Sequence, residues 1–279
     1  MSAEIREPLA APHGLSASAN RVGAMVLRYV YLIRSSFPRI IELMYWPLVQ
    51  MLLWGFVQMH LAQTANIYAQ AAGLLIGAVL LWDILLRSQF GFSLSFLEEI
   101  WSRNIGNILM SPITPNEFVA ALMVTSLIRL TIGLVPVIFL ADLFFGFNLF
   151  TLGLPLAAFF ANLVFMGWSI GLISTAMVLR FGLGAESFAW TAVFLLLPIS
   201  CVYYPLATLP EWLQQVALSL PSTHVFEGLR ALFFNQEFRS DLLWMTAGLN
   251  VMYFTASFAF FRYMLWRARI HGSLLQLGE

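Results

Sequence analysis

Six long runs of apolar residues constrain this chain more than any other feature of its sequence. About 20 consecutive apolar residues cross the hydrocarbon core of a bilayer as one helix, which satisfies its own backbone polar groups without water. Charged residues are only 10% of the sequence, against roughly 25% in soluble domains. We therefore predict an all-α integral membrane protein with six spans, placed near Leu43–Ala62, Ile67–Leu86, Phe118–Leu140, Leu152–Leu179, Phe188–Tyr203 and Leu242–Phe261.

The placement of arginine predicts the orientation of these spans, because positively charged loops stay in the cytoplasm. Arginine supplies all 14 cationic residues. Eleven of them lie before span one, between spans two and three, between spans four and five, or after span six, whereas two lie between spans five and six. We therefore expect both termini, and the segment between spans two and three, to face the cytoplasm.

Several functional classes are excluded by what the sequence lacks. It has no lysine, so it cannot supply the lysine with which a P-loop binds nucleotide phosphates. Its formal net charge of zero gives no general attraction for nucleic acid. Because Cys201 is the single cysteine, an internal disulfide and a multi-cysteine metal site are excluded, and the scattered histidines predict no metal site.

The first 20 residues are polar and small, and they contain no apolar run of the kind that signal peptides have. We expect residues 1–20 to be a flexible cytoplasmic segment, followed by a single membrane domain over residues 21–279.

A helix lying in the membrane interface is predicted at Arg21–Ile41. Arg21, Arg28 and Arg39 fall at nearly the same angle if each residue turns the helix by about 100°. Pro38 should break the helix, so that Arg39 belongs to a second piece. The arginines would either contact lipid phosphates or form a solvated face packed on protein.

The segment Ser95–Glu117 is a polar island between two apolar runs. Ser95 and Glu98 have the S-x-x-E spacing of a capping box, which predicts a helix that begins near Phe96 and ends before Pro112. Two interpretations remain open for this amphipathic cytoplasmic helix. It rests on lipid headgroups, or it receives force from a soluble partner.

Two further segments have the capping-box spacing. Thr114–Glu117 should begin the helix of span three, and Thr208–Glu211 should begin a short external helix that contains Trp212. Pro221 should end that helix, and Val225–Phe234 is typical of a second one. Each is too short to cross a bilayer, so we predict a re-entrant or interfacial pair between spans five and six.

Candidate catalytic residues are few. The segment Gly167–Gly171 matches the G-x-S-x-G pattern of hydrolases, but it lies inside an apolar helix rather than at a turn between a strand and a helix. Its glycines are more typical of a surface for close helix packing. An intramembrane hydrolase or transferase that uses Ser169 or His224 is retained as an alternative, although we find no convergent polar groups at one depth.

Two ionisable residues within the predicted spans are functional candidates, because burying a charge in a bilayer is costly. Asp83 lies near the cytoplasmic end of span two and has Arg87 one helical turn away, which predicts an ion pair of neighbours. Arg129 lies near mid-membrane depth and should face a helix, a second copy or a wet cavity. Its counter-ion cannot be named, since Asp83 is too shallow. An ion-driven transporter would need several buried acids, and Asp83 is the one credible example.

Three segments together resemble a known family. They are ELMYWPLVQMLLWGF at Glu42–Phe56, ILMSPITPNEF at Ile108–Phe118, and PLATLPEWLQQVALSLPSTHVFEGLRALFF at Pro205–Phe234. Their order and spacing resemble those of type 2 ABC exporter permeases, the family that includes O-antigen, nodulation-factor and drug-export permeases. The resemblance covers nearly the whole chain from about Arg21.

The resemblance implies a function. It makes the helix between spans two and three a coupling helix that docks on a separate ATPase subunit, with Glu98, Glu99, Arg103 and Asn107 in it. It places Trp212 and His224 in external gate helices. It implies a permease paired with a second copy in the bacterial inner membrane, surrounded by lipid, with ATP and magnesium on the ATPase and no cofactor on this chain. A lipid-linked glycan is the favoured cargo, and drugs or lipids stay open.

Overall fold

The computed structural model of the chain describes residues 14–64 and 74–270, and all the regular elements there are helices. Short 3-10 turns at 149–152, 182–185, 197–199 and 206–208 connect some of them. The helices are α1 (Leu15–Arg34), α2 (Phe37–Thr64), α4 (Leu74–Trp101), α5 (Ile105–Met110), α6 (Pro115–Phe145), α7 (Leu154–Phe181), α8 (Glu186–Leu196), α9 (Glu211–Leu218), α10 (Pro221–Asn235) and α11 (Ser240–Ile270).

Five helical segments in the described residues are long and apolar enough to cross a membrane, which makes this a multi-pass membrane protein. Four of them are α2, α4, α6 and α11, and the fifth runs from Leu154 to Ile199 through α7 and α8. The count of six predicted spans is therefore not confirmed. The predicted span Phe188–Tyr203 is helical only to Ile199, because Pro198 and the positive φ of Cys201 end the helix. α8 alone has 11 residues, too few for a crossing.

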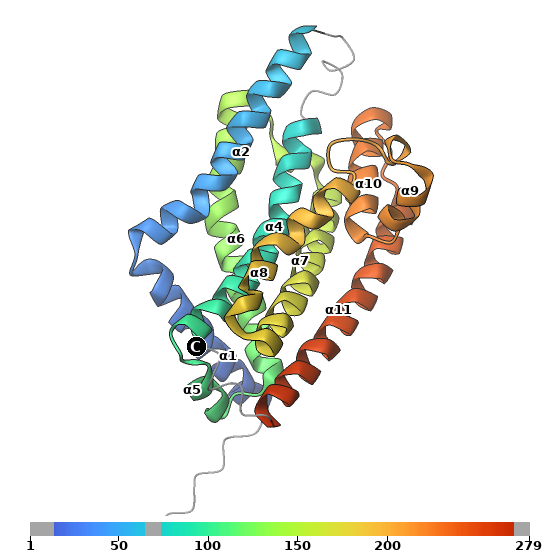
Figure 1. Cartoon of the computed structure of the whole chain (residues 1–279). Helices are drawn as coiled ribbons and strands as arrows, with labels where there is room; N and C mark the ends of the chain where they lie inside the picture. The colour runs from blue at the N-terminus through green and yellow to red at the C-terminus, as the bar shows by residue number, and fades with distance from the viewer. Residues whose placement is uncertain (1–13, 65–73, 271–279) are drawn as a thin grey trace, which may run out of the picture.

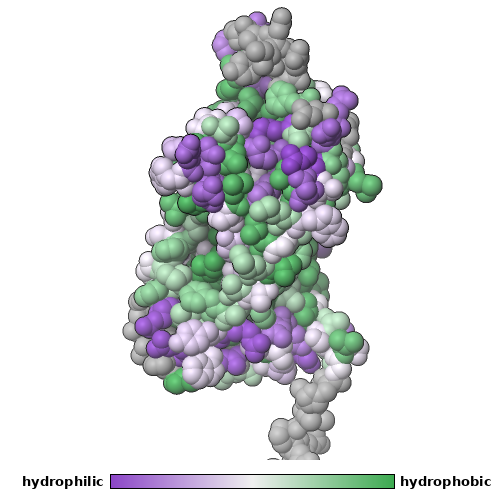
Figure 2. Space-filling view, turned by 90° about the vertical axis from the view of Figure 1, so that its right-hand side faces the viewer, coloured by the Kyte–Doolittle hydropathy of each residue, from purple (hydrophilic) through white to green (hydrophobic). Residues whose placement is uncertain are grey.

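The bundle is built around α4. Of its most apolar stretch, 83% is buried, against 17% in α2 and in α11. Helix α4 packs on α7 and α6, α11 packs on the outer side of α7, and α2 packs on α6 (Figure 1). The face shown in Figure 2 has a largely hydrophobic band between two hydrophilic zones, as expected of a protein surrounded by lipid.

The N-terminal helix differs from its prediction at both ends. Helix α1 begins at Leu15, so residues 15–20, predicted to be flexible, are helical; residues 1–13 lie outside the described part. The break comes at Ser35 and Ser36 rather than at Pro38. Proline is tolerated in the first turn of a helix, where the backbone N–H has no intrahelical partner, so Pro38 lies at the beginning of α2. Arg39 does belong to the second helix, as predicted.

The predicted helix start at Ser95 is wrong. Helix α4 continues without a break to Trp101, and the Ser95 hydroxyl donates to the Gly91 carbonyl one turn earlier instead of capping a new helix. No proline interrupts α4 before Ser95, and the residues around Ser95 are buried. The chain turns later, at Arg103 with φ 52°, and the short helix that follows is α5. The first seven residues of the predicted span Ile67–Leu86 lie outside the described part.

The second and third capping-box predictions have opposite outcomes. At Thr114 both hydrogen bonds of the box are present, with Glu117 as the partner residue, and Pro115 occupies the first turn of α6. Thr208 instead ends a 3-10 turn, and α9 begins after Pro210 without a side-chain cap. Proline before Glu211 fixes an extended backbone there, so the turn and the helix stay separate.

The bundle has two ends that differ in composition. The arginine end comprises α1, the last two turns of α4, α5 and the first turn of α6. The hairpin end comprises α9, α10 and the chain from Ser200 that leads into them. They lie at opposite ends of the long helices (Figure 1).

Candidate functional site

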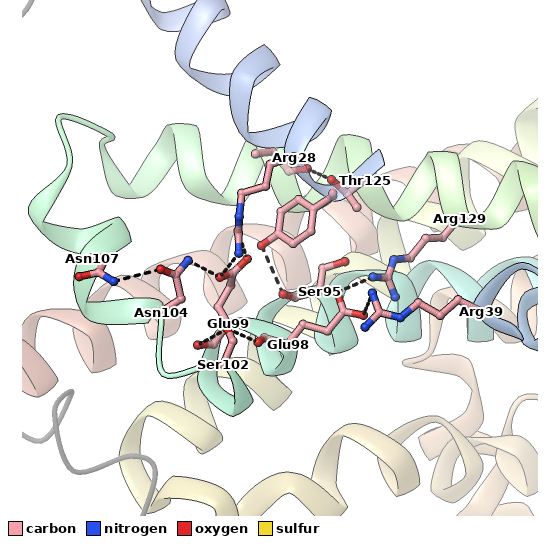
Figure 3. A network of polar contacts seen from close by, with 12 residues as sticks. Arg28, Arg39, Ser95, Glu98, Glu99, Ser102, Asn104, Asn107, Thr125 and Arg129 are labelled. Atoms are coloured by element: carbon pink, nitrogen blue, oxygen red, sulfur yellow. Dashed lines mark hydrogen bonds and ion pairs between the residues drawn. The ribbon is translucent and has the colours of Figure 1, made fainter. Parts of the chain in front are cut away.

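A buried carboxylate holds three segments of the arginine end together. The Glu99 side chain is fully buried and forms a bidentate ion pair with Arg28 of α1. The Asn104 amide donates to the same carboxylate at 2.8 Å, and Asn107 of α5 donates to Asn104 at 3.2 Å (Figure 3). A continuous chain of polar contacts therefore connects α5 to the end of α4 and to α1.

The surroundings of this carboxylate favour charged Arg28 and neutral Tyr29. The hydrogen bond to Glu99 raises the pKa of Arg28, so the guanidinium stays charged. Burial, with Glu99 close by, raises the pKa of the Tyr29 hydroxyl well above its usual range. That hydroxyl donates to the Ser95 carbonyl at 3.3 Å and adds a second link between α1 and α4.

Arg129 of α6 has a counter-ion that the sequence did not identify. Its Nη2 donates to Glu98 at 2.7 Å, and Glu98 also lies 4.0 Å from Arg39 of α2 (Figure 3). One acid thus joins α2, α4 and α6. The prediction that Arg129 faces protein or a cavity is confirmed, since it is 7% exposed and lines a cavity.

A third interhelical pair anchors α1 to the start of α6. Arg21 donates to both carboxylate oxygens of Glu117, with Nη2 2.5 Å from Oε1. Glu117 also accepts the backbone N–H of Thr114 as part of the capping box. Of the two interpretations of the N-terminal arginines, a face packed on protein is therefore the one that Arg21 and Arg28 follow.

A polar node within the bundle follows from one proline. Pro47 has no N–H, so the Leu43 carbonyl one turn earlier has no helical donor. Arg87 of α4 donates to that carbonyl at 2.7 Å and to Asp83 at 3.1 Å. Gly133 of α6 allows this approach, because a Cβ there would lie 2.5 Å from the Leu43 oxygen. The predicted Asp83–Arg87 pair is confirmed. Its predicted position at a helix end is wrong, because α4 continues for 14 residues beyond Arg87.

An open groove of about 960 Å³ runs along α4. Helices α2 and α8 form its walls, and Arg129 of α6 also lines it. Six charged side chains line it together with a larger number of aromatic and aliphatic ones. The charged residues are Arg39, Glu42, Asp83, Arg87, Glu98 and Arg129. Both polar arrangements that join α2 to α4 therefore border one cavity.

The four residues predicted to dock a partner do not lie together on one helix. Glu98 and Glu99 belong to α4 and make the internal ion pairs described above. Arg103 lies in the turn, and Asn107 is the member of the four that lies in α5; both are exposed. Met110 at the end of α5 is 83% exposed and Trp101 is 47% exposed. The exposed surface of this region is thus more apolar than the sequence suggested.

At the hairpin end, the two predicted gate residues are in contrasting positions. Trp212 on α9 is 71% exposed, whereas His224 on α10 is buried, with Nε2 2.8 Å from the Leu218 carbonyl oxygen. Glu227 and Arg230 stabilise the chain leading into these helices. Arg230 donates to the Cys201 carbonyl and Glu227 accepts from the backbone.

The G-x-S-x-G segment has a packing role. A Cβ at Gly167 would lie 2.7 Å from the Leu85 carbonyl oxygen of α4, and one at Gly171 would lie 3.0 Å from the Phe92 ring. The Ser169 hydroxyl donates to the Phe165 carbonyl of its own helix at 2.9 Å. These contacts are those of closely packed α4 and α7 and do not favour a nucleophile.

The comparisons with known proteins give one match. The family model described as ABC-2 type transporter matches residues 32–234, which is more than two thirds of the chain. No curated protein matches the sequence.

Proposed function

Since the chain belongs to the ABC-2 type transporter family, we propose that it is the permease subunit of an ATP-driven exporter whose ATPase is a separate protein. The absence of lysine supports a separate ATPase, because a P-loop needs that residue to bind nucleotide phosphates. ATP and magnesium would bind to the partner. The distribution of arginines supports a bacterial inner membrane orientation with both termini, and the arginine end, in the cytoplasm.

The observation that carries the proposal is the chain of polar contacts from α5 through Asn104 and Glu99 to Arg28. The ATPase would bind the exposed surface of Trp101, Arg103, Asn107 and Met110. Glu99 is too deeply buried to touch a partner, and we assign it the transfer of movement from α5 to α1 and α4. Glu98 would pass the same movement to α2 and α6 through Arg39 and Arg129.

Two copies would form the export path by placing their grooves face to face. The walls of the groove support this arrangement, since both present apolar side chains that no described part of the chain covers. Trp46 and Leu53 of α2 are 60% and 54% exposed, and Phe194 of α8 is 49% exposed. The aromatic lining favours an amphipathic cargo such as a lipid-linked glycan, because sugar rings and acyl chains both pack on aromatic faces.

The first experiment is purification of the chain in mild detergent from its native membrane, followed by identification of the proteins that copurify. We expect a P-loop ATPase, and we expect Met110→Asp and Asn107→Arg to release it. Arg269→Glu is the matched control, because Arg269 is an exposed residue in the last turn of α11 at the same end of the bundle. A chain that arrives alone in several mild detergents would contradict the proposal.

A second variant separates docking from transfer. Glu99→Gln keeps the shape of the side chain but removes the charge that holds Arg28. We expect this variant to retain the ATPase and to lose the stimulation of ATP hydrolysis by cargo. If Glu99→Gln releases the ATPase as completely as Met110→Asp, Glu99 contributes to docking instead.

A further inference from the structure

The groove along α4 has a polar end that is incompletely satisfied. Arg129 is 7% exposed, yet its Nε has no hydrogen-bond acceptor within residues 14–64 and 74–270. The hydrogen bond from Arg129 to Glu98 is made by Nη2. A guanidinium offers five N–H donors, and a buried donor without an acceptor is costly, so this side chain is prepared for another acceptor.

A second arginine borders the same place. Arg39 lies 4.0 Å from Glu98, at the limit of an ion pair, and donates to the Leu32 carbonyl at 3.3 Å. Its side chain is 44% exposed, so it can turn toward a ligand at little cost. In the part of the chain that the structure describes, the further acid at this end of the groove is Glu42, which is exposed to solvent and whose charge is therefore screened. Two arginines thus share one close carboxylate.

The rest of the groove is suited to a hydrocarbon chain. Leu43, Val49 and Leu53 of α2 face Leu86, Phe90 and Leu94 of α4 across it. Trp101 lies beside the polar end, and tryptophan is enriched where hydrocarbon meets headgroups. Glu98 is three residues from the end of α4, or roughly 4.5 Å along the helix, so Arg129 and Arg39 meet its carboxylate close to that end of α4.

We propose that Arg129 and Arg39 bind the phosphate of an amphipathic lipid whose hydrocarbon chain lies along the groove. Phosphate oxygens accept from the Nε edge of Arg129 and from Arg39, while Glu98 keeps its bond to Nη2. Arginine suits this role because its planar fork matches two phosphate oxygens. The lipid is a cargo carrier or a phospholipid of the bilayer. The role of the lipid as cargo rests on the proposed function, whereas its binding to the two arginines does not.

The test uses the tryptophans of the groove as reporters, because bromine on a lipid chain quenches tryptophan on contact. Trp46, Trp54, Trp101 and Trp190 all line it. The purified chain in detergent micelles is titrated with dibrominated phosphatidic acid and, separately, with dibrominated diacylglycerol that carries the same chains but no phosphate. We expect the phosphate-bearing lipid to quench at a concentration about tenfold lower.

Variants assign the effect to the two arginines. Arg39→Gln should weaken quenching by phosphatidic acid several-fold, because it removes a charged donor from an exposed position without disturbing the core. The double variant R129Q/E98Q should weaken it about tenfold and keeps the buried site neutral. Arg269→Gln is the control and should change nothing, since it lies in the last turn of α11. Equal quenching by the two lipids, or full affinity in both groove variants, would overturn the proposal.

Competition identifies the source of the lipid. A polyprenyl phosphate that displaces dibrominated phosphatidic acid at a much lower concentration than unbrominated phosphatidylglycerol indicates a cargo carrier. Equal displacement indicates a resident phospholipid, and both results support the site. The purification experiment fails independently, because a chain that binds no ATPase would still show phosphate-dependent quenching.

Discussion

The two ends of the bundle are stabilised by different kinds of ion pair. At the arginine end the partners are far apart in sequence, by 96 residues for Arg21 and Glu117 and by 71 for Arg28 and Glu99. At the hairpin end the described ion pairs join near neighbours. Arg230 and Glu227 are three residues apart, and Arg239 and Asp241 just below are two apart.

This difference indicates how each end can move. An ion pair between distant segments ties separate helices to one another, so a push on α5 is transmitted to its neighbours. A pair between near neighbours stiffens one segment and leaves its attachment to the bundle to other contacts. At the hairpin end those contacts include Tyr253 donating to the Ser219 carbonyl and Thr223 donating to the Ile199 carbonyl. We expect the arginine end to move as one body and the hairpin end to move on its own.

The largest effect is expected between the two ends, where Arg87 satisfies Asp83 and the Leu43 carbonyl. Arg87→Met leaves both groups buried without a donor and should destabilise the chain by roughly 3–5 kcal/mol. This loss of stability is measured as the change in apparent Tm in detergent, which is determined by size-exclusion chromatography of heated samples. Adding Asp83→Asn and then Pro47→Ala, which returns an N–H to the Leu43 carbonyl, should restore stability step by step. Without any recovery, the proposed origin of the node in Pro47 is wrong.

A smaller effect is expected at the arginine end. Arg28→Ala leaves the fully buried Glu99 without its cation, and the loss should be about 2–3 kcal/mol because Arg28 itself is partly exposed. Glu99→Gln should cost less, since the amide replaces the charge and Arg28 can turn to solvent. The same heating assay gives both values. The comparison of the two ends assumes that buried Glu99 depends on the charge of Arg28. A larger loss of stability in Glu99→Gln than in Arg28→Ala would contradict it.

The close packing of α4 on α7, which joins the two ends, should tolerate an added methyl group less well than the surface of the bundle does. Gly167→Ala places a methyl group 2.7 Å from the Leu85 oxygen and should cost about 1–2 kcal/mol by separating α4 from α7. Gly248→Ala in α11 is the matched control, because a Cβ there meets nothing within 4 Å and alanine favours a helix. The apparent Tm should fall in the first variant and stay or rise in the second.

The smallest effect is expected for the local pair near the hairpin end. Both Arg239 and Asp241 are exposed, and such pairs contribute little to stability. Arg239→Gln should leave the apparent Tm within the error of the measurement, and transport should be unchanged. A clear loss of stability would show that short-range pairs at this end have more than a local role.

The sequence predicts the membrane-spanning character of the chain because long apolar runs have no other stable environment. It also predicts the start of α6, since the contacts of Thr114, Pro115 and Glu117 are local and recur wherever that spacing caps a helix. It fails at Ser95, where the same spacing occurs inside a helix. The local signal could not show that the preceding turns of α4 are buried and continue the helix.

The counter-ions were missed because they depend on how helices meet. Glu98 lies just before the turn that ends α4, and Arg129 lies about four turns into α6, which runs back alongside α4. Antiparallel helices allow two such residues to meet but do not require it. Pro47 carried a clearer signal. A proline inside an apolar helix leaves one carbonyl without a donor, and an arginine in the next span was available to satisfy it.

The distance in sequence between Arg21 and Glu117 has a consequence for biosynthesis. Chains grow at roughly 5–20 residues per second, so Arg21 waits about 5–20 seconds before its partner, 96 residues later, has been made. During that time α1, although synthesised first, has neither Glu99 nor Glu117 to bind until the helices after it are in place. The first helix to leave the ribosome is thus fixed only after α2, α4 and α5 have been made. A nascent chain arrested before Glu99 should leave α1 open to protease, and one that extends well beyond Glu117 should protect it.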